Sequence, residues 1–124
     1  MPSRSLSSSG IVFLDREQAL ADMRRVIATL VARRAGIREV WLFGSLARGN
    51  ATARSDADFL IVVDQDERRP MDRSPEFLLL LEGLGRPADV LVLTTAEWNV
   101  RDGTALQREV VAHGIQLYPL SEGS

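Results

Sequence analysis

The chain contains no cysteine and no lysine, and all 15 of its basic residues are arginine. Without cysteine it has neither disulfide bonds nor thiolate metal ligands. Without lysine it lacks the side chain that P-loop nucleotide binding, protein-kinase chemistry and Schiff-base catalysis require. These two absences exclude those enzyme classes before any motif is considered.

Long apolar runs and histidine are also scarce. No apolar run approaches the ~20 residues of a membrane-spanning helix, and the N-terminus lacks the hydrophobic stretch of a signal peptide. We therefore expect a cytoplasmic protein without membrane contact. The net charge of −2 argues against nucleic acid as the main partner. The single histidine, His113, is a candidate general base, but the chemistry favoured below does not need it.

The length of 124 residues and the apolar content of 45% suit one soluble domain. We expect a disordered, serine-rich leader over residues 1–10, a single domain over 11–120 and a short tail over 121–124. Apolar spacing predicts helices over 15–34, 74–84 and 102–112, with a short helical turn over 95–98, and strands over 40–43, 57–63, 88–93 and 115–118. This order predicts an α/β fold in two layers, a small mixed sheet with helices packed on it.

Residues 64–73, DQDERRPMDR, have no apolar period and contain one proline. They predict an exposed loop, in which Asp64 and Asp66 end the preceding strand and face water. Ser74 and Pro75 then suit the start of the next helix, as a cap followed by a proline at the first helical position.

The stretch from Val40 to Val63 contains most of the candidate functional residues. Gly44 follows the strand VWLF and allows a sharp turn with close approach to the backbone. Ser45 is a candidate N-cap for the short turn SLARG, which would leave free N–H groups at a positive helix end. Such an end favours a phosphate, and Arg48 and Arg54 can add positive charge beside it.

Two carboxylates head the second strand of this stretch. Residues two apart in a strand face the same side, so Asp56 and Asp58 are predicted to project together and to raise each other's pKa. A divalent cation relieves that repulsion, and Mg²⁺ commonly uses one or two carboxylates together with substrate phosphates. The alternative is structural: Gly44 and Ser45 form an ordinary turn, and the two carboxylates mark a solvated strand end.

With these residues in place, GSLARGNATARSDADFLIVV resembles the signature of the DNA polymerase beta-type nucleotidyltransferases, Gly-Ser, a spacer and Asp-x-Asp. The short chain is similar to their smallest branch, the minimal nucleotidyltransferases, which include antitoxins paired with HEPN-domain toxins. The resemblance covers residues 37–92 and, more loosely, the segment REVVAHGIQLY. It implies the fold of that family and a third carboxylate on a later strand, for which Asp89 is the matching position.

The same resemblance implies ATP as substrate, AMP as the group transferred and two Mg²⁺ ions as cofactors. Gly44 and Ser45 would hold the β- and γ-phosphates, and Asp56 and Asp58 would bind both ions. Asp89 would join one ion and help to deprotonate an acceptor hydroxyl.

Two other functions stay open. An adenylyltransferase acting on a small molecule would need an acceptor pocket, for which this chain has no additional segment. A non-catalytic antitoxin would act as a binding module and would not require the carboxylates.

The helix expected after Ser74 predicts a partner. Its apolar side chains from Phe77 to Leu84 surround most of its circumference, so one face is expected to remain exposed as an interface. The resemblance implies a HEPN toxin or another hydroxyl-bearing protein as the partner. Self-association into a homodimer is a competing use of the same face.

Overall fold

The computed structural model describes residues 16–49 and 56–120. The predicted leader, the tail and Arg54 lie outside these residues. No helix in the described part is both long and apolar enough to cross a membrane. In chain order, the elements are α1 (Arg16–Arg33), β1 (Ile37–Phe43), α2 (Ser45–Arg48), β2 (Ala57–Val63), α3 (Pro70–Leu80), the 3-10 turn η1 (Glu82–Leu84), β3 (Ala88–Thr94), α4 (Thr95–Asn99), α5 (Ala105–His113) and β4 (Ile115–Tyr118).

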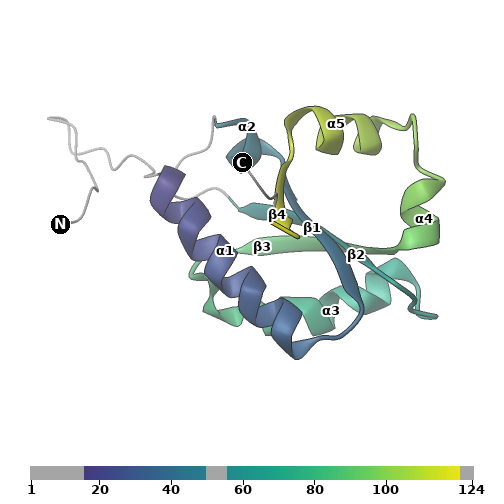
Figure 1. Cartoon of the computed structure of the whole chain (residues 1–124), viewed down its shortest axis with the longest axis horizontal. Helices are drawn as coiled ribbons and strands as arrows, with labels where there is room; N and C mark the ends of the chain where they lie inside the picture. Colours follow the sequence, from purple (N-terminus) through teal and green to yellow (C-terminus); the bar gives the residue numbers. More distant parts are fainter. Residues whose placement is uncertain (1–15, 50–55, 121–124) are drawn as a thin grey trace, which may run out of the picture.

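The four strands form one mixed sheet in the order β3-β2-β1-β4 (Figure 1). β1 runs antiparallel to β2 and to β4, whereas β2 and β3 run parallel. The predicted α/β fold with a small mixed sheet is therefore confirmed. Because of these directions, β1 ends where β2 begins, and β2 and β3 begin at the same edge of the sheet.

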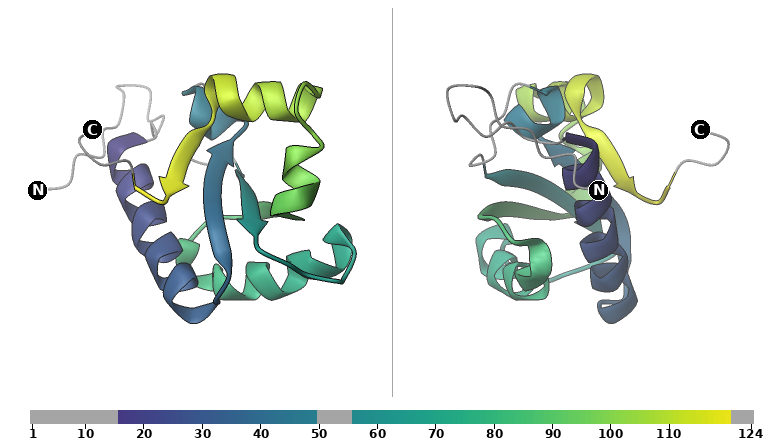
Figure 2. Two further views of the ribbon diagram at one scale, coloured as in Figure 1. Left: turned by 45° about the vertical axis from the view of Figure 1, so that its right-hand side comes forward. Right: turned by 90° about the vertical axis from the view of Figure 1, so that its left-hand side faces the viewer.

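Helices cover both faces of the sheet (Figure 2). Alternate residues of β2 separate into two apolar clusters, as the period of two in a strand requires. Phe59 and Ile61 pack in a large cluster with α1 and α3, while Leu60 and Val62 pack in a smaller one with Val110 of α5. Burial on both faces explains why the sequence of β2 is an almost continuous apolar run.

The start of α3 differs from the prediction. The helix begins at Pro70, so Pro70 and not Pro75 is the proline of its first turn, and Pro75 lies inside it. The last four residues of the predicted loop are therefore helical. As a consequence Arg73 becomes part of the helix, and it is only 2% exposed.

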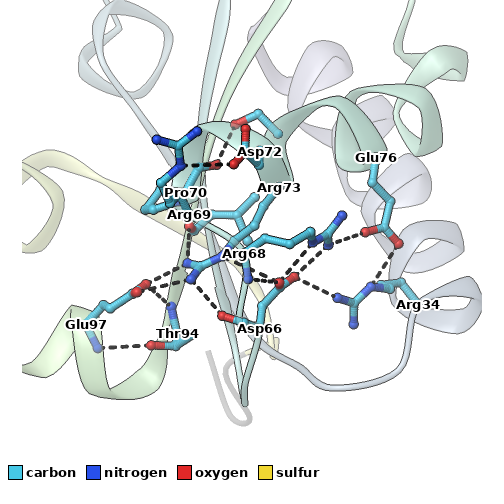
Figure 3. Close-up of polar contacts among 12 residues, drawn as sticks. Arg34, Asp66, Arg68, Arg69, Pro70, Asp72, Arg73, Glu76, Thr94 and Glu97 are labelled. Carbon is cyan, nitrogen blue, oxygen red and sulfur yellow. Dashed lines mark hydrogen bonds and ion pairs between the residues drawn. The ribbon is translucent and has the colours of Figure 1, made fainter.

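Arg73 is the centre of a polar network that the sequence did not predict (Figure 3). Its guanidinium donates to both carboxylate oxygens of Glu97, at 2.6 and 3.1 Å. It also donates to the carbonyl oxygens of Val92, at 3.0 Å, and Asp66, at 2.8 Å. The network joins α3 to the end of β3, to α4 and to the segment after β2.

Asp66, predicted to face water, is part of this network. Its side chain is 6% exposed and pairs with Arg68 at 2.6 Å and with Arg34 at 3.5 Å. Hydrogen bonds from Arg68 hold the pKa of Asp66 well below its ordinary value. The prediction of an exposed loop is therefore wrong for this residue, because its charge is compensated by Arg34, just after α1, by Arg73 of α3 and by Arg68 of its own loop.

The segment after β3 contains the two helical pieces that were predicted, the short α4 and the longer α5. Thr94 caps α4 in a capping box with Glu97. The side chain of Thr104, and not that of Asp102, caps α5 by accepting from the backbone N–H of Gln107. The predicted strand over 115–118 is confirmed as β4.

Candidate active site

The turn after β1 brings the backbone of Gly44 against a carboxylate. Gly44 has φ of 78°, a conformation that favours glycine. A Cβ atom at this position would lie 2.3 Å from Oδ2 of Asp58. Only glycine leaves room for this contact. Ser45, predicted as the N-cap, is instead the first residue of α2, and Gly44 occupies the cap position.

The sheet registers bring together residues from three separate segments. Asp58 lies opposite Phe43, the last residue of β1, and on its other side lies opposite Asp89 of β3. Asp58 is therefore the central residue of the site, with the glycine turn on one side and the second carboxylate on the other. Asp56 lies one residue before β2 and is exposed.

The electrostatics of Asp58 reflect this crowding. Its pKa is raised, first by burial and then by the negative charges of Asp89 and Asp56. The predicted repulsion between carboxylates is thus present for Asp58. A cation placed among the three side chains would relieve it.

The carboxylate group fits a divalent ion in its chemistry. Oxygen ligands are those that Mg²⁺ prefers, and it usually completes its shell with water and phosphate oxygens. Among residues 16–49 and 56–120, however, no three histidine, cysteine, aspartate or glutamate side chains converge closely enough to form a metal cluster. Asp58 and Asp89, which lie opposite each other in the sheet, could therefore supply part of the ligands of a Mg²⁺ ion. Oxygens of a bound phosphate would supply others.

Two arginines contact α2, the single helical turn after Gly44. Arg16 of α1 donates to the carbonyl oxygen of Ala47 at 2.8 Å. Arg48, at the end of α2, donates to Glu109 of α5 at 3.2 Å. Arg48 was predicted as a nucleotide-binding residue, whereas Arg16 and Glu109 were not. They lie far from the motif in sequence, Glu109 by 61 residues from Arg48, and no local pattern marks them.

His113, the other candidate from the sequence, is the last residue of α5 and is exposed. Among the described residues it makes no hydrogen bond with any of the three carboxylates. It is placed at a helix C-terminus, where a positive charge is favourable.

Comparison with known proteins gives a consistent result. Residues 24–115 match the family model described as "Nucleotidyltransferase domain". The chain is 34% identical over 85 residues to a protein of Methanocaldococcus jannaschii named "Putative protein adenylyltransferase MJ0604"; the match covers 68% of this chain and 82% of that protein.

Solved structures with the same fold include a crystal structure of a "putative nucleotidyltransferase" from Sulfolobus solfataricus. It is 25% identical, with a TM-score of 0.52, and the match covers 68% of this chain and 75% of the other. A mutant of the toxin-antitoxin MntA-HpeT is 24% identical, with a TM-score of 0.55, and the match covers 80% and 73%. These similarities support the same fold for this chain.

Proposed function

Because the chain belongs to the nucleotidyltransferase domain family, we propose that it transfers AMP from ATP to a hydroxyl group on a partner protein. The observation that carries this proposal is the position of Asp58, in contact with the Gly44 turn and in register with Asp89. The relative named as a protein adenylyltransferase supports AMP as the group transferred.

The order of the strands suggests on which side of Asp58 the nucleotide and the acceptor would lie. Gly44 and Ser45 follow β1, Asp58 lies on β2, and Asp89 lies on β3, the edge strand beyond it. The triphosphate would therefore lie on the β1 side, against the turn and near Arg48. The acceptor hydroxyl would approach from the β3 side, where Asp89 is exposed and could accept its proton. Arg54, predicted to bind the nucleotide as well, is outside the described residues.

Asp56, Asp58 and Asp89 would hold the divalent ions. When bound, such ions polarise the reacting phosphate and steady the charge of the attacking and leaving oxygens. The chain's own contribution is to place the negative charges of Asp89 and Asp56 near Asp58, which makes the site electrostatically unfavourable until a cation arrives.

Incubation with ATP labelled at the α-phosphate, Mg²⁺ and a HEPN-domain protein tests the proposal. We expect label on the protein partner. Label on a small molecule instead would favour the small-molecule alternative. Capture of the partner without any label would favour the non-catalytic antitoxin.

Asp89→Ala is expected to abolish detectable transfer while MgATP still binds within about threefold of the wild-type affinity. Asp89 lies one strand further from Gly44 than Asp58 does, so its loss affects the acceptor side and leaves the phosphate side intact. Calorimetry with MgATP and a labelling assay measure the two effects separately. Loss of nucleotide binding would contradict the assignment of Asp89 to the acceptor side.

The exposed apolar face expected on α3 is present. Leu79 is 72% exposed and Leu78 is 39% exposed, whereas Phe77 and Leu81 are buried in the core. A shallow groove of about 220 Å³ between α1 and α3 adjoins Leu79. The chain continues from α3 through η1 into β3, at whose start Asp89 lies. A partner that docks on this face would thus lie near the acceptor side of the site.

Leu81, although apolar, is unsuitable for testing this surface because it is buried.

Leu79→Glu is expected to weaken capture of the partner protein by at least about tenfold without changing the unfolding midpoint. A charge in the centre of an apolar contact must be desolvated on binding. Val111→Glu on α5 is a matched control, because Val111 is also an exposed apolar residue, at 58%. Light scattering on both variants distinguishes partner docking from self-association. Equal capture by wild type, Leu79→Glu and Val111→Glu would exclude α3 as the interface.

A further inference from the structure

We propose that Glu109 competes with the nucleotide's phosphates for Arg48 and so holds the affinity of the site for ATP below its maximum. This inference rests on the proposed function. It assigns a role to a residue on α5 that lies outside the signature motif.

The first observation is the pairing itself. Arg48 Nη1 lies 3.2 Å from Glu109 Oε2. Among the described residues this is the only hydrogen bond or ion pair that the Arg48 side chain makes. The guanidinium that the proposed function assigns to the phosphates therefore already has an anionic partner.

The second observation is the position of α5. Its residue Val110 packs under the sheet with Leu60 and Val62 of β2, the strand that carries Asp58. α2 and α5 lie side by side in every view (Figures 1 and 2). The packing of Val110 holds the backbone of α5 in place, so the Glu109 side chain remains within reach of Arg48 when a nucleotide arrives.

The magnitudes favour competition over support. The pair is partly exposed, with 44% of the Arg48 side chain and 28% of the Glu109 side chain accessible. A single-contact pair of this kind orients its arginine by a factor of less than about five. By contrast, if Arg48 binds the Glu109 carboxylate and a phosphate at the same time, the two negative charges lie about 7 Å apart. At that distance their repulsion weakens binding about two- to threefold for each phosphate charge, even in water. A triphosphate carries several such charges, so repulsion by Glu109 exceeds any benefit from orienting Arg48.

The expected consequence is a site that releases nucleotide and pyrophosphate readily. Before binding, Glu109 compensates the charge of Arg48. After binding, the carboxylate and the phosphates face the same guanidinium. Glu109 therefore raises the free energy of the bound state and leaves the free protein nearly unchanged.

Glu109→Gln tests the inference, because it keeps the shape and a hydrogen-bond acceptor but removes the charge. Calorimetry with MgATP at low salt is expected to show about fivefold tighter binding, and the gain should shrink as ionic strength rises. In an Arg48→Gln background the same substitution should change the affinity less than twofold. In a transfer assay, KM for ATP should fall without a rise in kcat.

Asp64→Asn is the matched control. Asp64 pairs with Arg38 at 2.5 Å at the opposite end of the β1–β2 pair, so the variant makes the same change in net charge away from the site. Tighter binding by Glu109→Gln together with wild-type binding by Asp64→Asn supports the inference. Unchanged or weaker binding by Glu109→Gln, or equal gains in both variants, overturns it. If folded wild-type protein fails to bind MgATP at all, the proposed function fails, and this inference fails with it.

Discussion

Asp58→Asn is expected to lower the rate of AMP transfer by at least two to three powers of ten. Among the residues of the site that the structure describes, Asp58 alone both contacts the Gly44 turn and lies in register with Asp89. Asparagine keeps its size and shape but removes the charge, and loss of one preorganised charge at a reacting centre commonly has an effect of this size. The measurement is a single-turnover labelling assay with saturating MgATP and partner.

The same substitution is expected to keep or raise the stability of the protein at pH 7. The pKa of Asp58 is raised in the folded state, chiefly by burial and then by Asp89 and Asp56. Because the pKa is raised from its ordinary value of 3.8, stability falls as the pH rises from 3.8 through the folded pKa, and at higher pH the ionised carboxylate carries the full destabilisation. Asparagine removes this cost, so the unfolding midpoint should not fall in metal-free buffer.

The two readouts together make the test decisive. Asp64→Asn, which also neutralises one aspartate, serves as the control and should transfer AMP at the wild-type rate. A folded Asp58→Asn variant with wild-type activity would contradict the proposed catalytic role. Inactivity accompanied by a lowered midpoint would assign Asp58 a structural role.

Arg73→Met is expected to lower the free energy of unfolding by about 2–3 kcal/mol, because it removes charge-assisted hydrogen bonds made by a buried guanidinium, whereas the Glu97 side chain, 36% exposed, stays in contact with water. Arg73 is 2% exposed. Its loss would leave the carboxylate of Glu97 without its bidentate partner and the carbonyl oxygens of Val92 and Asp66 without their donor. Methionine retains much of the apolar stem, so the measured loss reports mainly on the polar contacts. Urea unfolding at pH 7 is the measurement.

Arg69→Met is a matched control for this prediction. Arg69 lies in the same segment, but its side chain is 77% exposed, and within residues 16–49 and 56–120 it pairs with Asp72 alone. Its replacement should change the unfolding free energy by less than about 0.5 kcal/mol. If Arg73→Met and Arg69→Met have equal effects, the network centred on Arg73 does not stabilise the fold.

The Arg73 network also predicts how stability changes with acid. Hydrogen bonds from Arg73 are the main cause that lowers the pKa of Glu97 to about 2, from 4.5. The unfolded chain therefore takes up a proton at Glu97 before the folded chain does. Stability is fully present above pH 4.5 and is lost as the pH falls toward 2. In Arg73→Met this part of the acid dependence should be absent.

The Arg73 network, which stabilises the fold, lies apart from the carboxylates of the candidate active site. Arg73 contacts Val92 in the second half of β3 and Glu97 follows that strand, whereas Asp58 and Asp89 lie at the beginnings of β2 and β3. A substitution in the network should therefore alter the unfolding free energy more than nucleotide affinity. The C-terminal end of the parallel strands β2 and β3 thus stabilises the fold, and their N-terminal end carries the carboxylates of the candidate site.

The sequence by itself determined the features that depend on neighbouring residues. The apolar run of β2 could only be a buried strand, and Gly44 could only serve a turn with close backbone approach, because both follow from local periodicity and local conformational freedom. The spacing between the Gly-Ser pair and Asp58 could also be recognised in the sequence, because both lie within one short stretch of chain. These local constraints were sufficient to predict the fold class and the centre of the candidate site.

Only the tertiary structure decided which distant residues meet. The register of β2 with β3 places Asp58 opposite Asp89, and a shift of one residue would have turned one carboxylate to the other face. The burial of Arg73 depends on Glu97, and the charge of Arg48 is compensated by Glu109, 61 residues away. A single sequence contains no signal for such pairs, because an exposed arginine and a buried, fully paired one have the same local pattern. Their energies depend on the packing of separate segments, and that packing exists only in the folded chain.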